Sequence, residues 1–423
     1  MKVMKFRAVQ LLSIALISVF LTHFASARDD QRVALTTKAQ SDFDRVSLSV
    51  QPPLGDTATC AQSQAALLSI SPPEDLAELH YRKGYCLLAG ATVTGNRQDY
   101  TAATAELDQA IEAWPARVRK PVKNAPPEPV PSGLSALDAL AHLNVEGEAA
   151  AQPRLAAAVA NPACAASLMQ DRVCRQWVET ARQWLGRIAL RAGDLDAAAV
   201  DFNGLPQTGW EDWTQGKRAF EAHNYAQAVS RFNAAILTWK AVWSNPGPGF
   251  ARRLGPHPEM PAALTDLAGG QMLAGNPQAA TATLDASLKA DPASARALYL
   301  RARAKELAGH TTEALADYNL AARAAFAASA DLASGEAHLY RGILLFRRKD
   351  YGRAEDEFAS ALNFSIAHPL QADAEAWRHL AAVASGSCVA ARQNLERSLA
   401  SVSPYFPKEE ARNTAASCRS ASN

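Results

Sequence analysis

The stretch Leu267–Ala322 reads LAGGQMLAGNPQAATATLDASLKADPASARALYLRARAKELAGHTTEALADYNLAA and contains one pattern of small, apolar and turn-forming residues twice. Subtracting Gly275 from Gly309, or Ala280 from Ala314, gives 34 residues each time. A period of this length is typical of one supersecondary unit that stacks on copies of itself. Apolar residues recur at helical spacing on both sides of each glycine, which predicts two helices joined by a turn.

The pattern continues on both sides of this stretch. Its alanine in the second helix recurs at residues 198, 228, 280, 314, 354 and about 391, in steps of 30, 52, 34, 40 and 37 residues. These residues resemble the tetratricopeptide repeat family, whose unit is a 34-residue pair of antiparallel helices. The resemblance implies an all-α fold, an α-solenoid of antiparallel helix pairs, with an irregular helical region towards the N-terminus. The step of 52 contains a Pro- and Gly-rich insertion at residues 244–258, so the array is irregular.

Composition divides the chain into five segments. A basic start, an apolar run and an Ala-Ser-Ala site predict a signal peptide at the N-terminus. The expected segments are residues 1–27, the signal peptide; 28–114, an N-terminal helical region with a partly ordered lead-in and one divergent repeat; 115–133, a Pro-rich linker; 134–181, Ala-rich helices outside the repeat pattern; and 182–423, the repeat solenoid with a C-terminal capping helix.

The signal peptide predicts an exported protein, periplasmic in a bacterium with two membranes and secreted otherwise. The apolar run is shorter than the roughly 20 residues that a membrane helix needs, so we expect no stable membrane insertion after cleavage. An uncleaved N-terminus that holds the protein at a membrane is the alternative. Loss of Lys2, Lys5 and Arg7 takes the formal net charge from +1 to 1 − 3 = −2. This near-neutral charge argues against nucleic acid as the partner.

The six cysteines predict disulfides, because an even number in an exported chain favours them. Residues equidistant from the turn of an antiparallel helix pair face each other, and two pairs flank expected turns at residues 71–74 and 401–407. The middle pair is ten residues apart, too far to bond along a continuous helix, so its bridge requires a break near residues 169–171. The alternative is buried free thiols, above all for the middle pair. The candidate pairs are Cys60 with Cys86, Cys164 with Cys174, and Cys388 with Cys418.

The sequence lacks the motifs of common catalytic and metal sites. It contains no His-Glu-x-x-His, no Gly-x-Ser-x-Gly, no phosphate-binding Gly-x-x-x-x-Gly-Lys and no Cys-x-x-Cys, whose spacings place nucleophiles, metal ligands or phosphate-binding amides together. We therefore predict a protein that is not an enzyme and has no metal or cofactor. The alternative is an envelope enzyme, or an essential enzyme subunit, with a site in residues 134–181 or 244–258.

The resemblance also implies a binding surface. In this family the first helix of each unit lines a concave groove that often holds a peptide, and aromatic residues beside cations suit a partner with apolar and acidic groups. We therefore predict a non-catalytic scaffold of the cell envelope that binds a protein or peptide partner. For any single aromatic residue the alternative is packing against the neighbouring repeat. The residues at groove positions are Gln183, Arg187, Arg191, Trp210, Trp213, Lys217, Phe220, Arg296, Tyr299, Arg303, Leu339, Phe346 and Arg347.

Overall fold

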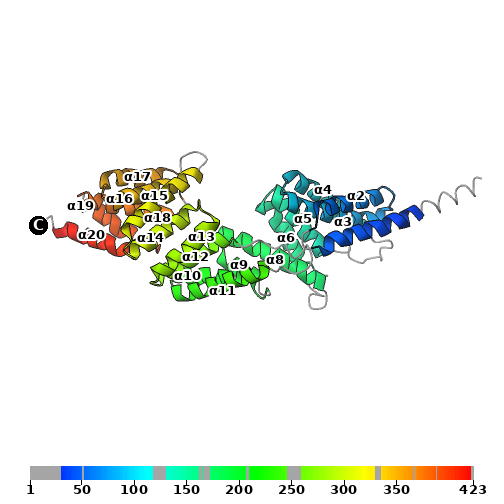
Figure 1. The fold of residues 1–423 in the computed structure, drawn as a ribbon, viewed down its shortest axis with the longest axis horizontal. Coiled ribbons are helices and arrows are strands. Elements are labelled where there is room, and N and C mark those ends of the chain that lie inside the picture. The colour runs from blue at the N-terminus through cyan, green and yellow to red at the C-terminus, as the bar shows by residue number, and fades with distance from the viewer. Residues whose placement is uncertain are drawn as a thin grey trace, which may run out of the picture. The chain divides into compact units, whose positions relative to one another are not determined.

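The computed structural model describes residues 30–49, 52–117, 130–161, 164, 172–205, 209–244, 259–328, 335–364, 366, 368–386 and 388–420. Within these ranges the regular elements are helices and there is no strand (Figure 1). The prediction of an all-α fold is confirmed. Two compact units divide the chain, one of Met1–Pro206 with Val242–His257 and one of Gln207–Ala241 with Pro258–Asn423. No helix in the described residues is long and apolar enough to cross a bilayer.

The first unit is a succession of helices in which each packs on the next. After a helix at residues 30–48, they are α2 (Leu54–Leu68), α3 (Pro73–Thr94), α4 (Arg97–Ala113), the short 3₁₀ helix η1 (Trp114–Arg117), α5 (Ser132–Val145), α6 (Glu148–Val159), α8 (Arg172–Ala192) and α9 (Leu195–Phe202). Among them, α3 and α4 carry the divergent repeat. An added Cβ at Gly84 would lie 2.7 Å from the Leu107 side chain, so glycine permits this close approach.

The helix at residues 30–48 is more regular than the partly ordered lead-in that the sequence predicts. Its apolar residues Leu35, Ala39 and Val46 lie on one helical face and pack into the first unit. Arg32 forms an ion pair with Asp75 at 2.5 Å. The many polar residues on the outer face of this helix obscure its narrow apolar stripe in the sequence.

One predicted disulfide is present in the first unit. Cys60 of α2 and Cys86 of α3 are bonded, with their Cα atoms 5.9 Å apart, and residues 69–72 form the turn between the two helices. The predicted pairing of Cys60 with Cys86 is therefore confirmed. Cys164 is also disulfide-bonded. The side chains of Cys174, Cys388 and Cys418, and the expected break at residues 169–171, lie outside the described part of the chain.

The described residues of the second unit form five helix pairs and a final helix. The pairs are α10 (Trp210–Glu221) with α11 (Tyr225–Ser244), α12 (Met260–Leu273) with α13 (Pro277–Ala290), α14 (Ala295–Leu307) with α15 (Thr311–Ala328), α16 (Gly335–Arg347) with α17 (Tyr351–Asn363), and α18 (His368–Ala384) with α19 (Cys388–Ser398). The final helix, α20 (Lys408–Ser420), packs on α18 and α19 (Figure 1).

Turn residues explain where the helices of a pair separate. Gly275 adopts φ +85°, a conformation that side chains with a Cβ rarely adopt, and this ends α12. The next residue, Asn276, accepts a hydrogen bond from the Ala279 N–H at 3.2 Å and so caps α13. Pro277 then occupies the first position of α13, where the missing N–H costs nothing.

Close contact between the two helices of a pair recurs at a fixed spacing. An added Cβ would lie 2.6 Å from the Phe232 ring at Gly216, and 2.6 Å from the Phe358 ring at Gly342. Both pairs are 16 residues apart, as are Ala268 and Leu284 of α12 and α13. The alanines at residues 198, 228, 280 and 354 have no exposed surface. A small residue opposite a large one therefore sets the distance between the helices in pair after pair.

Candidate partner-binding surface

The first helices of all five pairs in the second unit contact one segment, residues 403–410, which follows α19 and opens α20. We call the contacting residues the first-helix surface. They are Phe220 of α10, Gly269 of α12, Arg296 of α14, Arg347 of α16, and Asp373 and Trp377 of α18.

Two adjacent aromatic residues of the segment make its apolar contacts. The ring centroids of Tyr405 and Phe220 are 6.0 Å apart. An added Cβ at Gly269 would lie 2.3 Å from the Tyr405 hydroxyl, so the surface is shaped to admit this side chain. Phe406 is buried and meets Trp377 edge to face, with centroids 5.2 Å apart. The two rings thus reach from α10 to α18.

Polar contacts hold the two ends of the same segment. Buried Asp373 accepts hydrogen bonds from the Ser403 backbone N–H at 2.7 Å and from the Ser403 hydroxyl at 2.6 Å. Burial raises the pKa of Asp373, and the bonds from Ser403 oppose this shift by favouring the charged carboxylate. At the other end, Glu410 forms an ion pair with Arg347.

A buried carboxylate organises the α10 and α12 end of the surface. Asp266 accepts a hydrogen bond from the Trp213 indole at 3.2 Å and forms ion pairs with Lys217 at 3.0 Å and Arg296 at 3.1 Å. Burial alone would raise the pKa of Asp266, but the two cations reverse the shift and lower it. Arg296 also hydrogen-bonds with the Tyr405 hydroxyl. Asp266 therefore keeps a cation in place beneath Tyr405.

A second set of charges connects α14 to α16. Glu306 forms an ion pair with Arg347 at 2.6 Å and another with Arg303, and it accepts a hydrogen bond from the Tyr318 hydroxyl at 2.9 Å. Arg303 is 6% exposed. Since Arg303 is enclosed by these partners, its positive charge balances Glu306 inside the unit.

In the first four pairs of the second unit, a small residue lies 16 positions before a large one, and a buried alanine lies four positions before that large residue. A turn separates the two helices of each of these pairs. The repeats are tetratricopeptide-like.

No family model and no curated protein matches the chain. Among solved structures, the chain is similar to yeast Tom70 (11% identity, 92% of this chain and 89% of that one, TM-score 0.35). It is also similar to a tetratricopeptide repeat protein from Parabacteroides merdae (15% identity, 77% and 99%, TM-score 0.39), and to one from Thermus thermophilus (17%, 48% and 98%, TM-score 0.31).

Several residues predicted at groove positions of the tetratricopeptide-like repeats are enclosed. Trp210 and Trp213 pack against Trp239, with ring centroids 5.1 and 5.4 Å away. Tyr299, which is 5% exposed, stacks on Tyr340 at 5.0 Å. Tyr299 therefore packs against the neighbouring repeat, as the alternative states. Trp210 and Trp213 instead pack against the second helix of their own pair.

The other predicted residues fall into two groups. Lys217, Arg296 and Arg347 lie at or beside the first-helix surface, and the side chain of Arg296 is 56% exposed. In contrast, Gln183, Arg187 and Arg191 lie on α8 in the first unit. There, Arg191 forms an ion pair with Glu148 at 2.7 Å, and the Arg187 guanidinium lies 5.1 Å from the centre of the Trp184 ring.

Neither the acidic partners nor the role of the segment is predicted from the sequence. Asp266 and Asp373 belong to no expected site, and residues 401–407 are expected only as a turn. The sequence does contain one indication that this segment is buried. It has adjacent tyrosine and phenylalanine residues between two prolines, and such residues are unusual in a solvent-exposed turn.

One cluster of ionisable groups in the first unit has the donor atoms and the spacing that a metal ion requires. His142 Nε2 lies 3.3 Å from Asp108 and 3.4 Å from Asp138, and these three residues could supply ligands. Burial raises the pKa of Asp138 to about 6, with His142 opposing the shift. Arg154 already forms an ion pair with Asp138 at 2.7 Å, and His142 is 4% exposed. The arrangement therefore suits a buried ion cluster better than a site that a substrate could reach.

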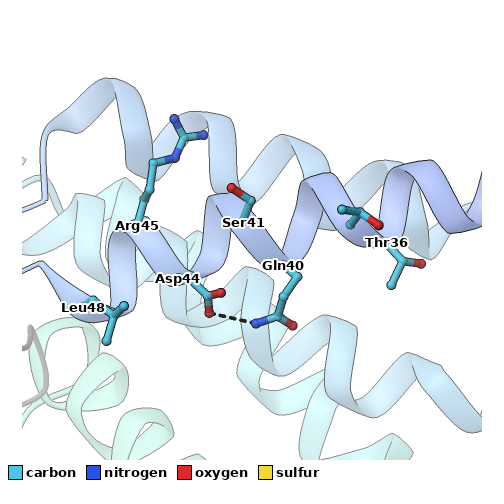
Figure 2. A pocket seen from close by; sticks show the side chains of 7 residues that line it. Thr36, Gln40, Ser41, Asp44, Arg45 and Leu48 are labelled. Atoms are coloured by element: carbon cyan, nitrogen blue, oxygen red, sulfur yellow. Dashed lines mark hydrogen bonds between the residues drawn. The ribbon is translucent and has the colours of Figure 1, made fainter.

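A shallow hollow on the helix at residues 30–48 lacks the features of a binding site. Figure 2 shows that its lining side chains come from this one helix. Gln40 donates a hydrogen bond to Asp44 at 2.8 Å, and the Thr36 hydroxyl donates to a carbonyl of its own helix at 2.7 Å. Among the described residues, no second element contributes to the lining of this hollow. The lining residues are Thr36, Thr37, Gln40, Ser41, Asp44, Arg45 and Leu48.

Proposed function

We propose that this protein is an exported, non-catalytic scaffold of the cell envelope that binds a peptide or protein partner on its first-helix surface. The observation that carries the proposal is the convergence of five first helices on one short segment, residues 403–410. A surface that accommodates a largely irregular stretch of its own chain has the size and chemistry to accommodate a stretch of another chain.

The mechanism is non-covalent. Packed helix pairs hold Phe220, Trp377 and Arg296 in fixed positions before any partner arrives, so the scaffold itself loses little entropy on binding. Aromatic rings contribute contact area, and arginine pairs with carboxylates of the partner. The Asp266 carboxylate fixes the orientation of Arg296.

The alternative of an envelope enzyme has one observation in its favour. Asp138, His142 and Arg154 converge within residues 134–181, one of the two regions in which the sequence allows such a site. The burial of Asp138 and His142 weakens this alternative, because a catalytic group must touch its substrate. A structure of the protein with a small molecule at His142 would favour the enzyme.

A photo-cross-linking experiment tests the scaffold proposal. A benzophenone amino acid at Phe220, in the full-length protein expressed in its native envelope, should form a cross-link to a partner that mass spectrometry can identify. The matched control places the same amino acid at Leu320, which is 44% exposed on the second helix α15, away from the first-helix surface. Cross-links from residue 220 to this protein's own segment alone would contradict the proposal, and so would the same partner yield from residue 320.

A further inference from the structure

The segment that covers the first-helix surface has the character of a bound peptide. Residues 399–407 between α19 and α20 are irregular, and their contacts reach as far as Phe220 and Gly269, well over 100 residues earlier in the chain. Pro404 and Pro407 flank the two aromatic residues. Because proline restricts the free chain, it lowers the entropy that such a segment loses when it docks.

The helix that follows is held by small side chains. In the described part of α20, the buried apolar residues are Ala411 and Ala415. Alanine buries little area compared with an aromatic or branched side chain, so α20 contributes less hydrophobic stabilisation than Phe406 does. Among the non-covalent contacts of the described residues, the attachment of residues 403–417 therefore depends mainly on Phe406, Tyr405 and the contacts of Ser403 and Glu410.

The contacts also describe what kind of ligand the surface recognises. Asp373 accepts a backbone N–H and a hydroxyl, Trp377 and Gly269 admit two adjacent aromatic rings, and Arg347 pairs with a carboxylate. In the segment these groups come in the order Ser403, Tyr405, Phe406, Glu410. A partner with the same groups in the same order would satisfy every one of these contacts.

We propose that residues 403–410 are an intramolecular ligand of the first-helix surface, and that the partner is a peptide segment carrying a hydroxyl residue, two adjacent aromatic residues and a following carboxylate. This inference rests on the proposed function and specifies its partner. Because the internal segment is tethered, its effective concentration is in the millimolar range. A partner therefore binds at full strength only after the segment has left the surface.

A peptide-binding measurement tests this proposal. The probe is a fluorescently labelled synthetic peptide of residues 401–417, and the proteins are the full mature chain and its Tyr405→Ala/Phe406→Ala variant. These substitutions weaken the internal segment and leave the first-helix surface intact. We expect the variant to bind the peptide at least about tenfold more tightly than the unmodified protein. A peptide carrying the same two alanines should not bind.

The matched control is Arg412→Ala/Asn413→Ala, which alters exposed residues of α20 and should bind the peptide as weakly as the unmodified protein does. A variant that removes less packing is Ser403→Ala, which removes one hydrogen bond to Asp373 and should raise peptide binding a few-fold. A folded Tyr405→Ala/Phe406→Ala variant that does not bind the peptide would overturn the proposal. Loss of cooperative unfolding of the second unit in this variant would also overturn it, because the segment would then be part of the core.

A second copy of the chain is the competing occupant. If the protein forms concentration-dependent dimers that exchange residues 403–417, the first-helix surface binds a second copy of the chain. This result would contradict the proposal of a separate peptide partner. Failure of this inference is distinguishable from failure of the proposed function. If the variant binds the peptide but no partner is cross-linked from residue 220, residues 403–410 are an intramolecular ligand and the scaffold proposal is wrong. If a partner is cross-linked but the variant does not bind the peptide, the scaffold proposal holds and the intramolecular ligand is wrong.

Discussion

Substitution of Trp377 by alanine should lower the free energy of unfolding of the second unit by about 4 kcal/mol, since the loss of a buried tryptophan removes both its burial and its packing. Trp377 has no exposed surface and contacts Phe346 at 5.2 Å, Phe358 at 5.9 Å and Phe406 at 5.2 Å between ring centroids. It therefore joins three elements of the unit: α16, α17 and the C-terminal segment.

Urea denaturation followed by far-ultraviolet circular dichroism measures this effect, with the slope of the transition checked for constancy. Leu320→Ala is the control, because Leu320 is 44% exposed and its truncation should cost less than about 1 kcal/mol. A Trp377→Ala protein as stable as the control would contradict the packing of the last repeat.

Replacement of Cys60 and Cys86 together by alanine should destabilise the first unit by about 3 kcal/mol. The disulfide closes a loop across a sequence separation of 26 residues, and its loss restores conformational freedom to the unfolded chain. The side chains are fully buried, so alanine is the replacement that introduces no buried polar group.

Urea denaturation of the Cys60→Ala/Cys86→Ala protein gives this difference. A reductant should lower the free energy of unfolding of the unmodified protein. It should lower the free energy of unfolding of the variant by a smaller amount, because the variant already lacks one disulfide. Equal stability of the oxidised protein and the variant would show that the bridge does not constrain the unfolded chain.

The repeats could be predicted from the sequence because the residues that shape each helix pair lie close together in the chain. In one helix pair, Gly342 of the first helix lies 16 residues before Phe358 of the second helix. The missing side chain of the glycine leaves room for the phenylalanine ring. The pairing of Cys60 with Cys86 followed from the same regularity, since residues equidistant from a turn face each other.

The binding surface could be predicted only in part, because a side chain's surroundings depend on distant residues. The family pattern places Arg303 and Arg347 on the first helices, but Glu306 and Glu410 determine that both are paired inside the unit. Asp373 pairs with Ser403, 30 residues later. Periodicity carries no information about such a contact, so the role of the C-terminal segment emerged only from the structure.

The most direct test of this account compares two cross-linking products in the native envelope. The benzophenone amino acid at Phe220 is introduced into the unmodified protein and into the Tyr405→Ala/Phe406→Ala variant. If residues 403–410 and the partner compete for the first-helix surface, the variant should give less cross-link to its own segment and more cross-link to the partner. A partner cross-link that stays constant or falls in the variant, while the internal cross-link falls, would contradict the account.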